Sequence, residues 1–402
     1  MMEKITFCIP SKNNLRYLKT CLPSIRINAS RDDHDIIIFV DADNDGTIEW
    51  LEQNQILYGY RYYINPKLNE ELYGIGKAYD HCVFWAETDI CMIFHADMML
   101  GQDADLNAWK HLNRGKVVCA TRIEPPLHPN AGEKILEDYG VWPEEFDEDG
   151  FDLAVGKYQM AYEGKTTTGM FAPWMIYKED LLAIGGHDPI LKSAREDSDI
   201  FNRFKLYGYE LIQSWDSLVY HLTGRGGQFQ TGDTQVKDEE WQKLMSNSTK
   251  EFIRKWGSNV KHTPMLDPII SPKYDIGIVM KGGYQLLEAL EPWCSTIYLK
   301  EPDDLPLYAF RDMISLYLDK EQPNTSTDLL KKIIDMTFWS GIPSNNILVN
   351  IDQSTFTQED YNIIQNLSEI IDQSGEIGKF NVGNMDIEIK EMNDYKDKLI
   401  KL

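Results

Sequence analysis

Residues 88–98 read Thr-Asp-Ile-Cys-Met-Ile-Phe-His-Ala-Asp-Met, and this stretch decides the fold that we expect. Its apolar run, Ile90 to Phe94, is typical of a fully buried strand. Asp97 follows just past the carboxyl end of that strand, where open α/β sheets bind ligands, and His95 is spaced to project beside it. We interpret Asp97 as a metal-binding carboxylate. The alternative is an Asp that caps the next turn.

Outward from this stretch, short apolar runs alternate with segments of helical periodicity. Strands are predicted at Ile5–Ile9, Asp35–Val40, Tyr60–Ile64 and Leu218–His221. Helices are predicted at Leu15–Ile27, from about Ile48, and from Gly74 to Trp85. The alternation predicts an α/β fold with a Rossmann-like, doubly wound, mostly parallel sheet.

Two regions interrupt or follow this pattern. The acidic segment Glu137–Asp152 contains Gly140, Pro143 and Gly150, and we expect a solvated insertion or a mobile flap. Beyond Lys261 a connection rich in proline leads into a second, smaller α/β domain, with a helix at Thr327–Trp339 and a strand at Met385–Ile389. The predicted domains are residues 1–262 and 263–402.

The composition excludes some classes of function. A net charge of -24 over 402 residues argues against a broad phosphate-binding surface and against binding to anionic membranes, although a local basic groove is compatible with it. The six cysteines show no spacing of metal ligands, which indicates reduced core residues and a cytoplasmic protein. No apolar stretch reaches 18 residues and no signal sequence is evident, so we expect no membrane span.

The loop after the second strand is acidic. Asp41-x-Asp43-x-Asp45-Gly46, with Glu52 at the twelfth position, satisfies the EF-hand calcium pattern. An EF-hand needs an entering helix, however, and a buried strand precedes this loop. We favour a loop that faces a nucleotide. A structural turn and a calcium site are the alternatives.

Three further motifs have two interpretations each. Gly74-Ile75-Gly76-Lys77 would let the backbone approach a phosphate, or is a plain turn into a helix. Glu196-Asp197 supplies a general base at a helix start, or only favours the helix dipole. His221, before the loop with Arg225, binds metal or phosphate, or is a structural histidine.

Taken in order, these segments from Ile5 to about Gly227 resemble the family 2 glycosyltransferases, whose fold is called GT-A. Ile9-Pro10-Ser11-Lys12-Asn13 resembles the turn after the family's first strand, and the loop from Asp41 to Thr47 its acidic nucleoside loop. Gly76–Asp80 is similar to a helix start of the family. His95-Ala96-Asp97 falls on its Asp-x-Asp metal motif, and Gly185-Gly186 with Glu196-Asp197 falls on its acceptor-side motifs.

The resemblance implies roles for particular residues. The implied catalytic residues are Asp197, as the base, and Glu196. The implied donor-binding residues are Pro10, Ser11, Asn13, Asp41, Asp43, Gly76, Lys77, His95, Ala96 and Arg225. The implied ligands of a divalent metal, Mn²⁺ or Mg²⁺, are Asp97, His221 and His95. The sequence departs from the family at His95, which replaces the first Asp. Imidazole is an acceptable ligand for manganese, and the alternative is that His95 contacts ribose or diphosphate.

The implied function is metal-dependent transfer of a sugar from a nucleotide-diphosphosugar, with a UDP-sugar favoured, to an acceptor hydroxyl with inversion. The acceptor is a glycan, free or lipid-linked, or a hydroxymethylated base in nucleic acid such as phage DNA. Two rival hypotheses are a catalytically silent sugar-nucleotide binder and a calcium-binding protein. The C-terminal domain presents the acceptor, forms a homo-oligomer or caps the fold.

Overall fold

The structure is a computed structural model that describes residues 2–223, 229–230, 233–237, 239–302 and 305–402. Contacts within the chain divide it into two compact units. Unit 1 comprises Met1–Met245, Lys261–Ile269 and Ile400–Leu402, and unit 2 comprises Ser246–Val260 and Ile270–Leu399. The division into domains 1–262 and 263–402 stays a prediction.

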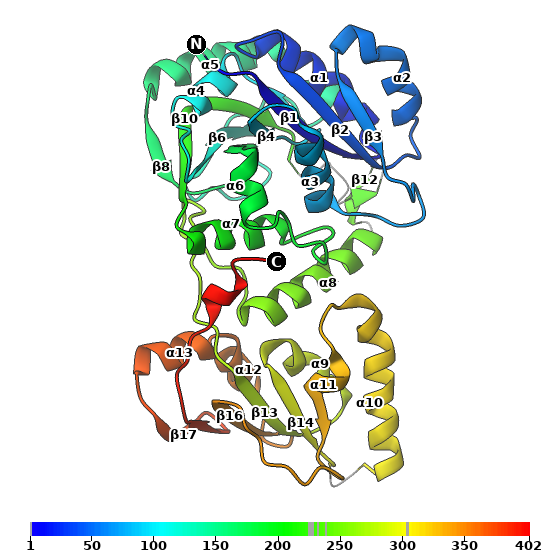
Figure 1. The fold of residues 1–402 in the computed structure, drawn as a ribbon, viewed down its shortest axis with the longest axis vertical. Helices are drawn as coiled ribbons and strands as arrows, with labels where there is room; N and C mark the ends of the chain where they lie inside the picture. The colour runs from blue at the N-terminus through cyan, green and yellow to red at the C-terminus, as the bar shows by residue number, and fades with distance from the viewer. Residues whose placement is uncertain (1, 224–228, 231–232, 238, 303–304) are drawn as a thin grey trace. The chain divides into compact units, whose positions relative to one another are not determined.

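A ten-stranded sheet forms the centre of unit 1 (Figure 1). Its strands are β1 (Ile5–Lys12), β2 (Asp35–Ala42), β3 (Arg61–Ile64), β4 (Ile90–Ile93), β5 (Met98–Leu100), β6 (Lys116–Glu124), β7 (Ile135–Leu136), β8 (Thr166–Thr168), β9 (Trp174–Tyr177) and β10 (Glu210–His221). The main path runs β3-β2-β1-β4-β9-β6-β10-β5, with β7 beside β6 and β8 beside β10.

The predicted mostly parallel α/β sheet is confirmed. β1 pairs in parallel with β2 and β4, β2 with β3, and β6 with β10. β9 runs antiparallel between β4 and β6, and β5 and β8 run antiparallel to β10. Because β9 is inserted antiparallel, β4 and β6 still point the same way, so the carboxyl ends of β1, β2, β4, β6 and β10 meet at one edge.

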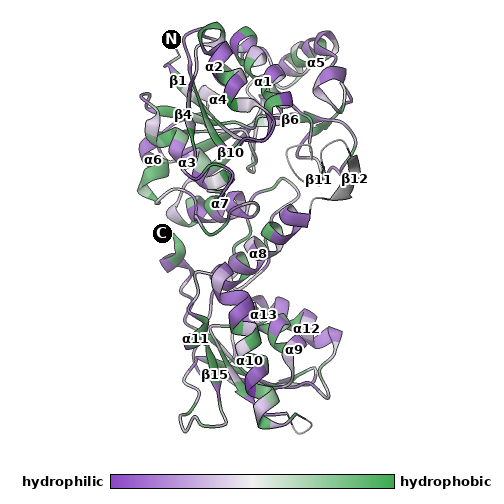
Figure 2. Ribbon diagram, turned by 90° about the vertical axis from the view of Figure 1, so that its right-hand side faces the viewer, coloured by the Kyte–Doolittle hydropathy of each residue, from purple (hydrophilic) through white to green (hydrophobic). Residues whose placement is uncertain are grey.

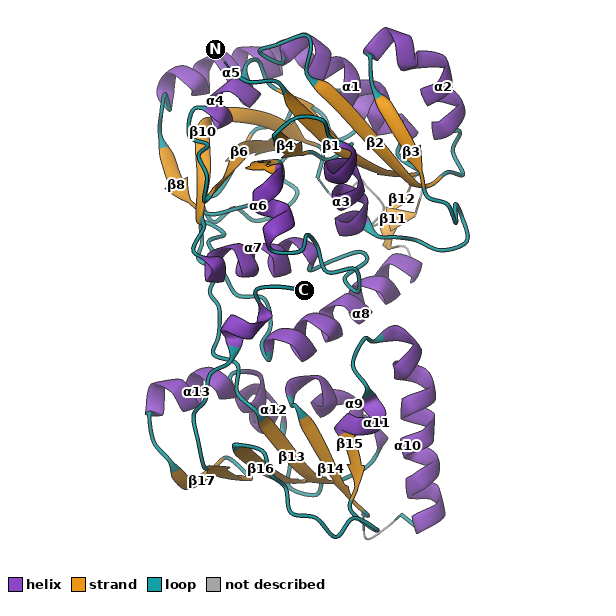
Figure 3. Ribbon diagram, viewed as in Figure 1, coloured by secondary structure: helices purple, strands orange, loops and turns teal. Residues whose placement is uncertain are grey.

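Helices cover both faces of this sheet (Figure 3). They are α1 (Leu15–Asn28), α2 (Thr47–Tyr58), α3 (Ile75–Trp85), α4 (Ala104–Trp109), α5 (Glu148–Ala161), α6 (Lys178–Ala183) and α7 (Glu196–Tyr207). α1, α2, α4 and α5 lie on one side, and α3, α6 and α7 on the other. Strands buried on both faces can be apolar throughout, which explains the run at Ile90–Ile93, where all four residues are buried. Figure 2 shows the hydrophobic stretches of the chain in green. The six cysteines are buried and unpaired, as predicted.

At residues 137–152 most of the charged side chains are exposed, as expected, but the segment is attached to the sheet. It contains a short 3₁₀ helix (Pro143–Glu145) and the start of α5. Its aromatic rings, Tyr139, Phe146 and Phe151, pack against Tyr220 of β10. These rings form an aromatic cluster that attaches the segment to the sheet. In the sequence, the charged residues between them make this cluster hard to recognise.

Unit 2 is a second, smaller α/β unit. Its six-stranded sheet has the order β15-β14-β13-β16-β18-β17. The strands are β13 (Ile276–Lys281), β14 (Thr296–Lys300), β15 (Ile333–Asp335), β16 (Ile347–Asp352), β17 (Gly378–Val382) and β18 (Met385–Ile389). The helices are α9 (Tyr284–Leu290), α10 (Leu307–Glu321), α11 (Leu329–Lys332), α12 (Gln358–Gln365) and α13 (Leu367–Ser374). The helix predicted at Thr327–Trp339 is wrong, because only α11 is helical there and β15 follows it.

Helix α8 (Glu239–Trp256) begins in unit 1 and ends in unit 2, and before it β11 (Phe229–Gln230) and β12 (Asp233–Lys237) form an antiparallel pair. Within unit 2, Arg254 of α8 donates to both carboxylate oxygens of Glu291, and Lys332 lies 2.6 Å from the same carboxylate. Glu291 is fully buried. Among the helices of the described residues, none is both long enough and apolar enough to cross a membrane.

Candidate active site

A cavity of about 560 Å³ lies at the edge of the unit 1 sheet where the parallel strands end. Each of five strands contributes residues from its carboxyl end or from the loop that follows it. The residues contributed in this way are Pro10, Ser11, Lys12, Asp41, His95, Ala96, Asp97, Arg122, Glu124 and His221. Residues 192–197, before and at the start of α7, line another side. This is the position at which open α/β sheets bind their ligands.

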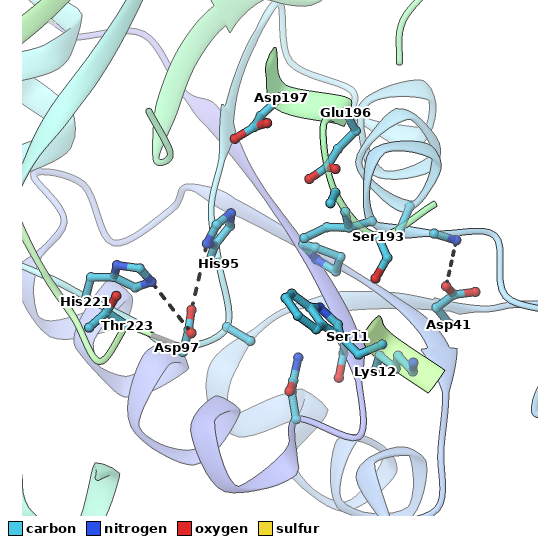
Figure 4. Close-up of a pocket in the computed structure, with 18 of the residues that line it drawn as sticks. Ser11, Lys12, Asp41, His95, Asp97, Ser193, Glu196, Asp197, His221 and Thr223 are labelled. Atoms are coloured by element: carbon cyan, nitrogen blue, oxygen red, sulfur yellow. Dashed lines mark hydrogen bonds and ion pairs between the residues drawn. The ribbon is translucent and has the colours of Figure 1, made fainter. Parts of the chain in front are cut away.

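Asp97 lies between two imidazoles inside the cavity (Figure 4). Its Oδ1 is 3.9 Å from Nδ1 of His95, and its Oδ2 is 3.7 Å from Nε2 of His221. The strand register explains the approach, because β5 pairs with β10 so that His221 lies opposite Met98, the residue after Asp97. The potential ligand atoms of the three residues lie within 4.8 Å of one another, close enough to share one metal ion.

The electrostatics of these three residues differ. Burial raises the pKa of Asp97, but His221 and His95 outweigh this effect and lower it. Burial lowers the pKa of His95 to about 4, so that its imidazole is neutral at pH 7. Burial also acts to lower the pKa of His221, but Asp97 and Glu124 outweigh it and raise the value to about 9. Asp97 is therefore an anion held beside two imidazoles of different charge.

Glu124, at the end of β6, was not predicted as a site residue. Its Oε1 lies 2.8 Å from Nδ1 of His221 and 2.6 Å from a guanidinium nitrogen of Arg122, and its Oε2 accepts from Lys134 at 2.8 Å. Glu124 has 1% of its surface exposed. Burial raises its pKa, but His221, Arg122 and Lys134 outweigh burial and lower it. A charge that ends an apolar strand was the signal that could have found it, as it found Asp97.

Glu196 and Asp197 project from the start of α7 toward the same region (Figure 4). The Oε2 atom of Glu196 is buried and has no hydrogen-bond partner among the described residues. Burial, and then the charge of Asp197, raise the pKa of Glu196 to about 8. Asp197 accepts a hydrogen bond of 2.5 Å from the backbone N–H of Ser198. The pair therefore combines a carboxyl that is neutral at pH 7 with a second carboxyl beside it.

Asp41 faces the cavity from the end of β2 and also holds the loop before α3. Its Oδ1 accepts from Asn65 at 2.8 Å and from the N–H of Tyr73 at 2.9 Å, and its Oδ2 accepts from the N–H of Gly74 at 2.9 Å. Ser11 also lines the cavity, and its Oγ is buried without a partner among the described residues.

Four predicted donor-binding residues do not line the cavity. The side-chain oxygen of Asn13 accepts from the backbone N–H of Asn44, and Asp43 accepts from the N–H groups at the start of α2. A Cβ on Gly76 would approach Cβ of His187 to 2.8 Å, which shows that this glycine permits close packing. Lys77 lies over the ring of Tyr73. Arg225, the remaining predicted donor-binding residue, lies outside the described residues.

Several basic side chains line the cavity in addition to the predicted residues. They are Lys12, Arg122, Lys134, Lys192 and Arg195. The cavity lining thus carries as many basic as acidic side chains in a chain whose net charge is -24, and these cations suit an anionic ligand.

Comparison with known proteins agrees with the resemblance seen in the motifs. Residues 6–147 match the model of glycosyl transferase family 2. This segment is therefore similar to that family over about a third of the chain. The match begins within β1 and extends past β7, and it includes His95 and Asp97. No curated protein matches the chain.

Solved structures of glycosyltransferases are similar to the chain at low sequence identity. TarS of S. aureus has a TM-score of 0.40 and 15% identity, over 55% of this chain and 36% of that chain. TarS residues 1–349 in complex with UDP has a TM-score of 0.38 and 14% identity, over 54% and 60%. GalNAc-T7 with UDP, GalNAc and Mn²⁺ has a TM-score of 0.44 and 13% identity, over 62% and 48%. The chain therefore spans less than two thirds of the length of each.

Proposed function

We propose that the chain is a metal-dependent glycosyltransferase that moves a sugar from a nucleotide-diphosphosugar to an acceptor hydroxyl, with inversion. The observation that supports it is the convergence of Asp97, Asp197 and His221 on one cavity at the carboxyl edge of the sheet. Their side chains come from positions far apart in the sequence. All three line this cavity, part of which is built by the segment that matches family 2.

The residues present fit a divalent cation. Asp97 is an anion and His95 is a neutral imidazole, and His221 would supply a second nitrogen once a bound cation displaces its proton. This set of one oxygen and two nitrogens is acceptable to Mn²⁺ and to other first-row metals. When bound, the cation would supply positive charge to the leaving diphosphate. We propose Asp97 as the anchor of that cation.

The protein's own residues carry the other roles. We propose that Asp197 accepts the proton of the acceptor hydroxyl and that Glu196, neutral at pH 7, donates a hydrogen bond to substrate beside it. Asp41 and Ser11 line the part of the cavity proposed for the nucleoside. Lys12 and Arg195 place positive charge along the path proposed for the phosphates.

The proposal is tested with the purified full chain and a panel of UDP-, GDP- and dTDP-sugars, with Mn²⁺ or Mg²⁺. We expect the release of nucleotide diphosphate to require a divalent cation, with a UDP-sugar preferred, and to be lost in Asp97→Ala. The matched control is Asp149→Ala, an exposed carboxylate on α5. Absence of binding and turnover with all donors, or equal turnover with a chelator present, would contradict the proposal.

A further inference from the structure

Among the described residues of unit 1, two carboxylate–imidazole pairs have both side chains less than one tenth exposed. In one, Nε2 of His34 lies 2.9 Å from Oδ2 of Asp105, and neither side chain is exposed. In the other, Nδ1 of His221 lies 2.8 Å from Oε1 of Glu124, and the exposed fractions of the side chains are 8% and 1%. The second ring nitrogen distinguishes the two pairs.

The pair at His34 is closed. Its other ring nitrogen, Nδ1, accepts a hydrogen bond of 3.1 Å from the backbone N–H of Ile5, so both nitrogens have protein partners. The pair at His221 is open toward the cavity. Nε2 of His221 faces Asp97 at 3.7 Å, which is longer than a hydrogen bond. The closed pair therefore stabilises the fold, whereas the open pair presents a nitrogen to a ligand.

The contact with Glu124 decides which nitrogen is presented. A carboxylate offers only lone pairs, so Nδ1 of His221 carries the proton that it donates, and Nε2, which faces Asp97, is the nitrogen left to a metal ion once the ion displaces its proton. Glu124 itself is held by Arg122 at 2.6 Å and by Lys134 at 2.8 Å, so its carboxylate has little freedom to turn. Three cations thus meet at one buried carboxylate.

We propose that Glu124 is a positioning residue, which fixes the tautomer and the ring orientation of His221 so that Nε2 can bind a divalent cation together with Asp97. The inference rests on the proposed function, because it takes His221 to be a metal ligand. A carboxylate that accepts a hydrogen bond from a metal-ligating histidine typically contributes about 10- to 100-fold to metal affinity.

The test measures Mn²⁺ binding to the full chain, with and without UDP, from the electron paramagnetic resonance signal of free Mn²⁺. We expect Glu124→Gln to weaken Mn²⁺ binding about 10- to 100-fold. Asp105→Asn is the matched control, because it changes the closed carboxylate–imidazole pair of the same unit, and it should leave Mn²⁺ affinity at the wild-type value.

Two further variants separate positioning from folding. Glu124→Gln with Lys134→Met removes a cation together with the carboxylate, so that no buried amine is left unpaired, and it should show the same weakened binding. In a His221→Ala background, Glu124→Gln should add no further loss of Mn²⁺ affinity, because its effect acts through that ring. In the ¹⁵N spectrum of the Mg²⁺-bound chain, the signature of an Nδ1–H tautomer of His221 should be present in the wild type and weakened in Glu124→Gln.

The outcomes distinguish this inference from the function on which it rests. Wild-type Mn²⁺ affinity in Glu124→Gln would overturn the role of Glu124 and leave the metal-dependent transferase intact. Additive losses in the double variant with His221→Ala would also overturn it. A wild-type chain that binds no Mn²⁺ under either condition would overturn both.

Discussion

Single carboxylates in this unit serve different purposes that depend on their neighbours. Asp41 lines the cavity but accepts three hydrogen bonds from the loop before α3, so it stabilises that loop even without a ligand. Asp197 accepts from the N–H of Ser198 and lines the cavity from the start of α7. Asp197 and its neighbour Glu196 form a pair of carboxyls at the start of α7.

Asp197→Asn should lower the rate of sugar transfer by about 10²–10⁴-fold, because the amide cannot accept the proton of the acceptor. The affinity for the nucleotide should stay near the wild-type value, since the side-chain volume is unchanged. Steady-state kinetics with a fixed donor and isothermal titration with UDP measure the two quantities. Asp149→Asn on the surface is the control, and near-normal transfer by Asp197→Asn would remove Asp197 as the base.

Glu196 should make unit 1 less stable as the pH rises. Its pKa is raised from 4.5 to about 8, so between these values the folded chain holds a proton that the unfolded chain has released. The free energy of unfolding then falls by about 1.4 kcal/mol per pH unit across this window from that group. Glu196→Gln should therefore raise Tm at pH 8 and leave it unchanged below pH 4.5. Glu163→Gln, an exposed control, should show no such pH dependence.

Sequence reasoning reached the acidic and imidazole residues that end apolar strands, because that pattern is local. Asp97 and His221 were both found in this way, and both line the cavity. Glu124 ends an apolar strand too, but its meaning depends on partners at positions 134 and 221. Lys192 and Lys12 line the cavity only because loops bring them there. No periodicity in the sequence indicates that these residues lie close together in the fold.

At the scale of elements, the acidic loop after β2 satisfies the EF-hand sequence pattern but does not have the EF-hand structure. β2, and not a helix, precedes the loop. Asp43 accepts from the N–H groups of Gly46, Thr47 and Ile48, and Asp45 accepts from the N–H of Leu15, which begins α1. These carboxylates cap two helices, so their lone pairs are engaged by the backbone. This geometry does not support the calcium-loop alternative.

Asp43→Ala should lower the free energy of unfolding of unit 1 by about 1–2 kcal/mol, as the loss of a strong helix cap does. Glu52→Ala should change it by less than about 0.5 kcal/mol, because Glu52 is exposed. Denaturant titrations with and without Ca²⁺ measure both values. Calcium that stabilises the wild type, but neither variant, would restore the EF-hand interpretation, which requires both residues.

The elements that sequence reasoning placed wrongly share one cause. At residues 137–152 the charges indicated solvent and are mostly exposed, but they gave no sign that Tyr139, Phe146 and Phe151 pack on Tyr220. In unit 2, a helical pattern at Thr327–Trp339 concealed the short strand β15, where Ile333 and Ile334 pair in parallel with β14. In both cases distant partners override the local pattern, whereas the strands buried on both faces needed no such partner to be recognised.

At the scale of the whole molecule, each unit has its own core. The core of unit 1 gathers around β1, β2, β4 and β10, and that of unit 2 around β13, β14 and β16. Unit 2 adds a buried ionic cluster in which Glu291 accepts from Arg254, Lys332 and Tyr317. Removing one partner from such a cluster leaves a buried charge uncompensated.

Glu291→Gln should therefore destabilise unit 2 by about 3–5 kcal/mol. Hydrogen exchange followed by mass spectrometry should show faster exchange in β13 and β14 and unchanged exchange in β1 and β4, because the cluster lies within unit 2. Glu288→Gln is the control, since this side chain is 34% exposed and pairs with Lys320 at the surface. Equal acceleration in β1 would contradict the independence of the two cores.

The pairing of β5 with β10 has a consequence for how this site can change. His221 is opposite Met98, so the backbone hydrogen bonds of two strands set the separation between the side chains at positions 97 and 221. Sliding either strand by one residue would turn one of these side chains to the opposite face of the sheet. A different ion preference is thus accessible by exchanging side chains at fixed backbone positions, but not by insertions or deletions within either strand.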